Sequence, residues 1–174
     1  SVELVGNGHS QGGKENKAER KDQHGSLLWT DVDYGHGGSV EAIARNEAGQ
    51  VVARHRIETA GKAVALRMQP EDRLWHADGM DLQYVNITAV DAKGRTVPGF
   101  AEPLTVSLSD NTVARFVALD NGDHYTNDLF LNVFTKPVRS GRMQLILRST
   151  RKAGTVKVTV KAGRLIRTLK TFTE

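Results

Sequence analysis

Apolar and polar residues alternate with a period of two along most of the chain, the pattern of strands that bury one face. No window of a dozen residues carries an apolar stripe at helical spacing. The alternation therefore predicts a nearly all-β protein. In the first part of the chain we expect four strands, at residues 2–5, 27–33, 40–45 and 51–58. The run Asn46-Glu47-Ala48-Gly49 predicts a hairpin between the last two.

The second part of the chain predicts a longer series of short strands. They are expected at residues 63–68, 82–91, 104–108, 113–119, 129–133, 143–149, 155–161 and 165–172. Turns rich in glycine and asparagine, which tolerate positive φ, separate several of them. Short strands spaced by turns indicate an immunoglobulin-like β-sandwich. We place the domain boundary at Gly61, so the prediction is two tandem immunoglobulin-like β-sandwich domains, residues 1–61 and 62–174.

The first of these domains has few strands for a sandwich. Small domains bury a smaller share of their surface, so four strands make a thin core. The charged insertion at residues 12–25 is predicted to be a solvated loop. We expect this domain to be truncated at its N-terminal side, with an unpaired sheet edge that something else covers.

Composition narrows the class of protein. The chain is 39% hydrophobic and 25% charged, near the averages of folded soluble domains. It has no cysteine, which excludes disulfides, thiolate metal sites and a cysteine nucleophile. No apolar run approaches the roughly 20 residues of a membrane-spanning helix, so no membrane partner is expected. The first residues lack the layout of a signal peptide, and we expect the chain to be part of a longer protein.

Positive charge is concentrated at the C-terminal end. Residues 139–174 carry 10 basic groups and 1 acidic group. Such a segment could attract nucleic acid or an anionic polysaccharide. However, Val156-Lys157-Val158-Thr159-Val160-Lys161 alternates, which places both lysines on the solvent side of a strand, where they discourage edge-to-edge pairing. We favour this second interpretation and expect no nucleic-acid partner.

Side chains with oxygen ligands are densest after the strand predicted at residues 113–119. The candidate metal ligands are Asp120, Asp123 and Asp128, because calcium binds several carboxylate or carbonyl oxygens. Their spacing lacks the regular alternation of a calcium loop. The alternative is a turn whose backbone these side chains cap, and we expect no cofactor.

Aromatic rings beside loop tips are candidates for carbohydrate binding, because a sugar can stack on an exposed ring. Trp75 and Tyr125 each lie next to a predicted turn. The alternative for Trp75 is packing in the core. The sequence has no Gly-x-Ser-x-Gly motif and no pair of histidines at His-x-x-x-His spacing, and we predict no catalytic residue in this chain.

Several short motifs occur in the order seen in a known family. They are Val2-Glu3-Leu4-Val5-Gly6-Asn7-Gly8, Trp29-Thr30-Asp31-Val32-Asp33-Tyr34, Ala77-Asp78-Gly79-Met80-Asp81-Leu82, Leu119-Asp120-Asn121-Gly122-Asp123 and Leu147-Arg148-Ser149-Thr150. With these motifs the chain resembles the C-terminal, non-catalytic region of bacterial glycoside hydrolase family 2 enzymes of the β-galactosidase type. It departs at Gly6, where the family has a bulky apolar residue, and in the enlarged insertion at residues 10–25.

This resemblance implies that catalysis belongs to two glutamates of a separate barrel domain, which would be the main partner of the chain. It implies an accessory region with a structural or substrate-positioning role, in a bacterial parent enzyme that is periplasmic or secreted. A polysaccharide or oligosaccharide is a further candidate partner. Two alternatives stay open, a carbohydrate-binding module and an adhesin or surface-stalk module, because sandwiches host many functions.

Overall fold

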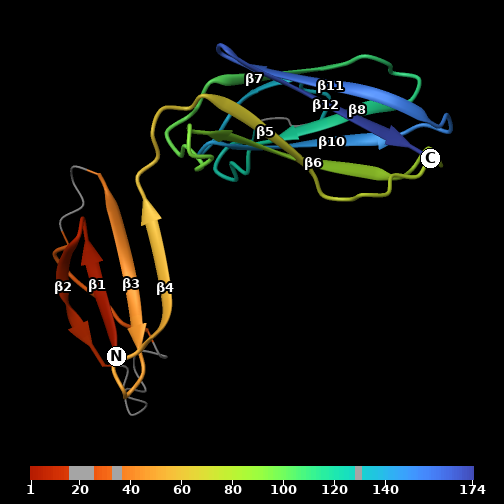
Figure 1. Ribbon diagram of the computed structural model, residues 1–174. Coiled ribbons are helices and arrows are strands. Elements are labelled where there is room, and N and C mark those ends of the chain that lie inside the picture. The colour runs from red at the N-terminus through yellow and green to blue at the C-terminus, as the bar shows by residue number, and fades with distance from the viewer. Residues whose placement is uncertain (16–25, 33–36, 128–130) are drawn as a thin grey trace. The chain divides into compact units, whose positions relative to one another are not determined.

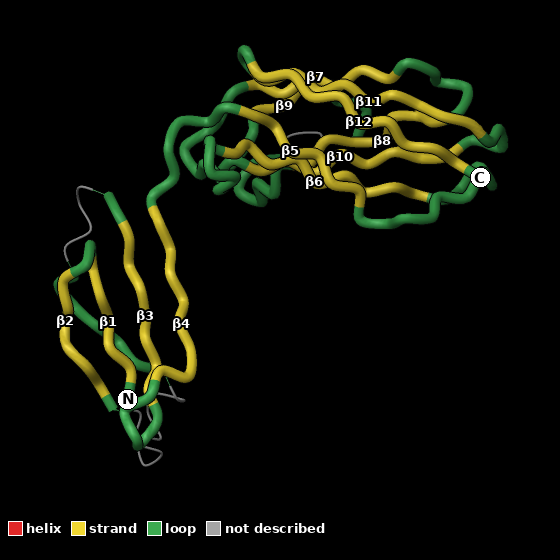
Figure 2. Tube along the Cα trace, in the orientation of Figure 1, coloured by secondary structure: helices red, strands yellow, loops and turns green. Residues whose placement is uncertain are grey.

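The computed structural model describes residues 1–15, 26–32, 37–127 and 131–174. The chain forms two compact units, Ser1–Thr59 and Ala60–Glu174. The described residues contain strands, turns and loops and no helix (Figure 2). The all-β prediction is therefore confirmed. Within this described part there is no helical segment with the length and apolar character needed to cross a membrane.

The first unit is built on one four-stranded antiparallel sheet in the order β2-β1-β3-β4. Asn7 and Gly8, both with positive φ, close the hairpin between its first two strands. Its described residues thus supply one layer of a sandwich, and Ile43 is the only buried hydrophobic side chain among them. The strands are β1 (Val2–Gly6), β2 (His9–Lys14), β3 (Ser39–Arg45) and β4 (Val51–Glu58).

Two sequence predictions in this unit are wrong. Residues 26–32 contain no strand, although one was expected at 27–33, and residue 33 lies outside the described residues. Side-chain hydrogen bonds hold this segment beside β2, because the Trp29 indole donates to the Gly12 carbonyl (3.1 Å) and the Lys14 ammonium donates to the Leu28 carbonyl. The strand β2 was not predicted, since its two adjacent glycines have low strand propensity. Most of the charged insertion, residues 16–25, lies outside the described residues.

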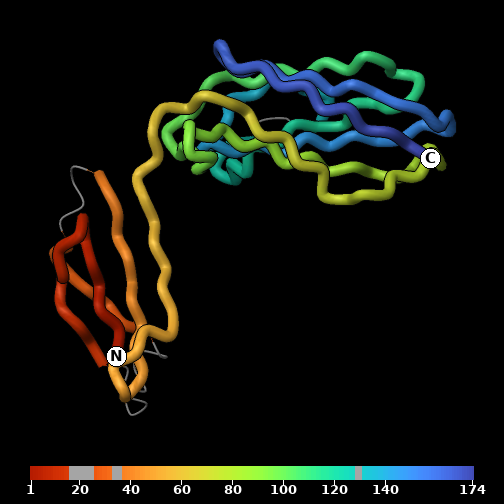
Figure 3. The backbone as a smooth tube through the Cα atoms, in the orientation of Figure 1, coloured from red at the N-terminus to blue at the C-terminus, as the bar shows by residue number. Residues whose placement is uncertain are grey.

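The second unit is an immunoglobulin-like sandwich of two antiparallel sheets, which face one another in Figure 1. One sheet has the order β5-β6-β10-β8 and the other the order β12-β11-β7-β9. The chain passes between the sheets several times before it ends in the β11–β12 hairpin (Figure 3). The strands are β5 (Ala65–Pro70), β6 (Leu82–Val90), β7 (Pro103–Leu108), β8 (Ala114–Asp120), β9 (Thr135–Pro137), β10 (Arg142–Ser149), β11 (Gly154–Ala162) and β12 (Leu165–Thr173).

Alternation fills the space between the two sheets with apolar side chains. Val85, Leu145 and Leu147 from one sheet are fully buried, as are Val156 and Val158 from the other. They belong to one continuous core cluster. The residues between them along each strand face outward, so each sheet keeps one polar surface.

The strand predicted at residues 129–133 is not found in its described part, residues 131–133. Residues 128–130 lie outside the described residues, and Leu131 forms only an isolated bridge with Ala118. Asn132 has φ 58°, which breaks the extended backbone. The edge strand forms later instead, as β9, where Lys136 pairs with Leu104.

Candidate functional site

The loop after β8 holds itself together through its own side chains. The Asp120 carboxylate accepts a hydrogen bond from the Gly122 N–H (2.8 Å), and the Asn121 side-chain oxygen accepts one from the Asp123 N–H (3.0 Å). The Asn121 amide also donates to the Pro137 carbonyl (3.0 Å), which ties the loop to β9. Asparagine and aspartate form such turns because their short side chains reach backbone donors two residues on.

Two of the three predicted metal ligands therefore have partners within the protein. The Asp123 carboxylate accepts from the Arg139 guanidinium (2.7 Å) and from the Tyr125 N–H (3.1 Å). Asp128, the third, lies outside the described residues. Within the described ranges, no group of three histidine, cysteine, aspartate or glutamate side chains could hold a metal ion. Backbone capping accounts for the Asp120 contact, whereas Asp123 combines a backbone contact with an ion pair to Arg139.

Tyr125 is the exposed aromatic residue of the loop. Its side chain is 82% exposed. The Arg139 guanidinium lies 5.7 Å from the centre of its ring, and the His124 ring lies 4.3 Å from it. An aromatic face bordered by hydrogen-bonding groups can receive the apolar face of a sugar ring. Of the two predicted carbohydrate-stacking residues, Tyr125 is therefore the exposed one.

Trp75 lies in a different environment, inside the core of the second unit. Its side chain is 2% exposed, and its indole N–H donates to the Asp81 carbonyl (3.1 Å). The neighbouring turn is fixed by Asp78, whose carboxylate accepts from the Met80 and Asp81 N–H groups (both 2.7 Å). The indole face is therefore not accessible to a sugar, and the core alternative describes this residue. The structure does not bring Trp75 and Tyr125 together in one exposed site.

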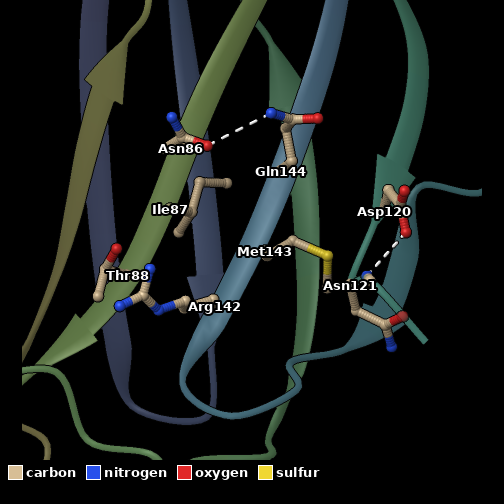
Figure 4. Close-up of a pocket in the computed structure, with 9 residues that line it drawn as sticks. Asn86, Ile87, Thr88, Asp120, Asn121, Arg142, Met143 and Gln144 are labelled. Carbon is tan, nitrogen blue, oxygen red and sulfur yellow. Dashed lines mark hydrogen bonds between the residues drawn. The ribbon is translucent and has the colours of Figure 1, made fainter. Parts of the chain in front are cut away.

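A shallow groove lies beside the Asp120 turn, on the outer side of the β6–β10–β8 sheet. Its volume is about 330 Å³, and Figure 4 shows that both polar and apolar side chains line it, the apolar ones being Ile87 and Met143. The Gln144 amide of β10 points at the Asn86 side-chain oxygen of β6 (3.4 Å). Thr88 and Arg142 lie opposite one another at one end of this groove.

Hydrogen bonds hold the perturbed carboxyl groups in their charged form. Backbone N–H groups of Met80 and Asp81 lower the pKa of Asp78, and the hydroxyl and N–H of Thr112 lower that of Asp110. The N–H of Gly61 and the Arg95 guanidinium lower the pKa of Asp91. A general acid needs the opposite shift, so these three carboxylates act as structural acceptors.

No sequence pattern singles out the groove residues Asn86, Arg142 and Gln144. On a strand, an amide or an arginine at an outward position has the pattern of any solvent-facing residue. The alternation did place them on the polar face. Their assembly depends on strand order, because β6 and β10 are neighbours in the sheet and far apart in the sequence.

Comparisons with known proteins give relatives for both units. Residues 66–168 match the family described as glycoside hydrolase family 2 C-terminal domain 5, and residues 1–53 match a domain of unknown function (DUF4982). The chain is 33% identical over 159 residues to beta-galactosidase BoGH2A of Bacteroides ovatus, covering 91% of this chain and 17% of that protein. It is 30% identical over 108 residues to a beta-glucuronidase of Formosa agariphila, covering 60% of this chain and 10% of that protein.

A solved structure shares the fold across both units. A glycosyl hydrolase family 2 member from Bacteroides cellulosilyticus superposes with a TM-score of 0.89 and 29% identity, over 99% of this chain and 21% of that one. The chain thus spans about a fifth or less of the length of these relatives.

Proposed function

The chain belongs to the C-terminal domain 5 family of glycoside hydrolase family 2, and from this premise we propose that it is a non-catalytic accessory region of a β-galactosidase-like enzyme. Its proposed role is structural, supporting a catalytic barrel and positioning substrate for it. The observation that carries the proposal is the match of residues 66–168 to a C-terminal domain. The similar β-galactosidase is much longer than this chain, which covers 17% of it.

The chemistry of the described residues supports a non-catalytic role. A retaining glycosidase needs two carboxyl groups about 5 Å apart, one of which has a raised pKa so that it can donate a proton. In the described part of the chain, each carboxyl group with a resolved shift has a lowered pKa instead. Asp91 illustrates the difference, because N–H groups of Gly61, Lys93 and Arg95 donate to its carboxylate and stabilise the anion.

A two-part assay tests this proposal. The 174-residue chain is incubated with nitrophenyl β-galactoside, and the longer parent enzyme is compared with a variant that lacks this chain. We expect no turnover by the chain alone, and a lower melting temperature or a lower kcat/KM for the shortened parent. Hydrolysis by the purified chain would refute the non-catalytic assignment. A shortened parent with unchanged stability and unchanged kcat/KM would refute the accessory role.

A further inference from the structure

Four arginines occupy the outer face of the sheet β5-β6-β10-β8. At one end of β10, Arg142 lies opposite Thr88, which in turn lies opposite Arg67 of β5. At the other end of β10, Arg148 lies directly opposite Arg115 of β8. All four arginines are exposed. Opposed residues of neighbouring strands point to the same side of a sheet, so Arg148 and Arg115 share one face.

The pairing of Arg148 with Arg115 is unfavourable in the protein by itself. Like charges directly opposite one another on a sheet are destabilising. In the described structure the ion pairs of arginine involve other residues, such as Arg54 with Glu41 and Arg139 with Asp123, and none of these four guanidiniums. An anion placed between two guanidiniums would remove the repulsion, since arginine binds carboxylate and sulfate-like groups in a forked geometry.

Between the two arginine ends, a polar row crosses all four strands in register. Its members, one from each strand, are Gln69, Asn86, Gln144 and Asp120. The Asn86 amide donates to Glu71 (2.8 Å), and the Gln144 amide lies 3.4 Å from the Asn86 oxygen, as Figure 4 shows. An amide both donates and accepts hydrogen bonds, which matches the hydroxyl groups of a sugar. The groove of about 330 Å³ lies along this row.

We propose that this surface, the arginine–amide face, binds an acidic oligosaccharide. The polar row pairs with sugar hydroxyls, and the arginines at both ends take the carboxylate or sulfate groups. The arginine ends are roughly 20 Å apart along β10, because a strand rises about 3.3 Å per residue. The ligand is therefore an extended chain with acidic groups at intervals. The site goes beyond the accessory role and does not depend on it, because the chain itself carries every residue involved.

The composition of the face distinguishes an oligosaccharide from a protein partner. The core of a protein interface is apolar and depleted in charged residues. On the arginine–amide face the centre holds three amides and the Asp120 carboxylate, and the Glu71 carboxylate accepts from Asn86, so the acidic groups of the ligand belong at the arginine ends. The large exposed hydrophobic side chains of the described residues lie at other positions. Tyr84 and Ile146, half-buried and opposed in the next row, offer a small apolar patch for a sugar ring.

Calorimetric titration of the 174-residue chain tests the proposal with four probes of matched length. They are a galacturonic acid hexamer, a heparin-derived sulfated hexasaccharide, neutral cellohexaose and a hexaglutamate peptide. We expect saturable binding of at least one acidic sugar and weaker binding of the neutral sugar and the peptide. The tighter acidic sugar identifies carboxylate or sulfate as the anion. Failure of both acidic sugars to bind would overturn the proposal, as would equal affinity for hexaglutamate, which would indicate an acidic protein partner.

A matched pair of double variants locates the site. Arg115→Gln with Arg148→Gln should weaken acidic-sugar binding roughly tenfold, because charge-assisted hydrogen bonds are lost. The melting temperature should stay the same or rise, since the repulsion is relieved. The control is Lys157→Gln with Lys170→Gln, an exposed cross-strand pair on the other sheet, which removes the same charge. Equal weakening by the control would show non-specific attraction and overturn the site.

Discussion

The two units use the same alternating strands and reach different degrees of burial. In the second unit, two sheets enclose a continuous cluster of apolar side chains. In the described part of the first unit, one sheet stands as a single layer, with Ile43 as its buried hydrophobic residue. Seven of the eight residues of β4 are exposed. Alternation therefore specifies strands, and only a second layer converts their apolar face into a core.

The interactions that hold the first unit are correspondingly weaker. Arg54 pairs with Glu41 across β4 and β3 (3.1 Å), but the arginine side chain is 54% exposed. Exposed ion pairs contribute little to the free energy of folding, at most about 1 kcal/mol. The burial of apolar surface in the second unit contributes far more, roughly 25 cal/mol per Å². We expect local opening in the first unit at lower free energy than in the second.

Truncation of a core side chain should produce the largest loss of stability. Leu145 is fully buried in β10. Leu145→Ala should lower the free energy of unfolding of the second unit by about 2–5 kcal/mol, through lost transfer energy and the cavity left behind. Urea unfolding followed by NMR signals of the second unit measures this loss. Ile166→Ala, at a residue 63% exposed on β12, is the control and should change stability by less than ~0.5 kcal/mol. Equal effects of the two substitutions would contradict the core assignment.

Substitution of Gly141 tests how closely two backbone segments of the second unit pack. Gly141 has φ 71°, and a Cβ there would clash with the Val97 carbonyl oxygen. Gly94 has φ 76° with no heavy atom within 4 Å of such a Cβ. Gly94→Ala should cost about 1–2 kcal/mol for the left-handed conformation alone. Gly141→Ala should cost about 1–3 kcal/mol more, because backbone must move.

Urea unfolding of both glycine variants, side by side, gives this difference. Equal destabilisation would mean that the close approach to Val97 has no energetic weight.

Asp91 should give the second unit a characteristic response to acid. Its side chain is 2% exposed, and it accepts hydrogen bonds from the Gly61 N–H (2.8 Å) and the Arg95 guanidinium. These donors lower its pKa below the ordinary value of 3.8. A lowered pKa means that the unfolded chain takes up the proton first as the pH falls. Stability is therefore full above the unfolded pKa and is lost as the pH falls through the folded pKa.

The variant Asp91→Asn isolates this contribution. It should melt several degrees below the unmodified chain at pH 7, because one carboxylate oxygen is replaced by a donor that faces other donors. This difference in melting temperature should narrow steadily between pH 4 and pH 2, because protonation of Asp91 removes the stability that its carboxylate contributes. Melting curves over this range measure it, and a constant gap would show that the Asp91 charge does not contribute.

The sequence predicted most of the second unit and less of the first for a physical reason. Strands such as β6, β10 and β11 alternate between buried and less buried residues over most of their length, because one face of each lies in a core. The strand β2 is exposed at every residue, so no burial pattern marks it in the sequence. The predicted strand near Trp29 failed for a related reason, because side-chain hydrogen bonds to β2 replace a sheet ladder.

For the candidate sites, local contacts could be predicted from the sequence and contacts between distant strands could not. The turn at Asp120 could be predicted, since its side chains bond to the backbone two residues away. The opposition of Arg148 and Arg115 could not, because it depends on which strands become neighbours and in which register.

Val→Thr substitutions compare the two units most directly, and the one in the first unit should have the smallest effect on stability. Val52 of β4 is 63% exposed, whereas Val158 of β11 is fully buried. Val→Thr keeps the shape of the side chain and replaces one methyl group by a hydroxyl group. Val52→Thr should change the free energy of unfolding by less than ~0.5 kcal/mol, because water satisfies the new hydroxyl. Val158→Thr, the matched control, should cost about 1–3 kcal/mol, because burial leaves the hydroxyl without water.

Urea unfolding, monitored by NMR signals from each unit, measures the costs of Val52→Thr and Val158→Thr separately. A cost at Val52 as large as that at Val158 would show that β4 is covered in solution. In that case the exposed sheet of the first unit would have a second layer, because an added hydroxyl is penalised only where water is excluded.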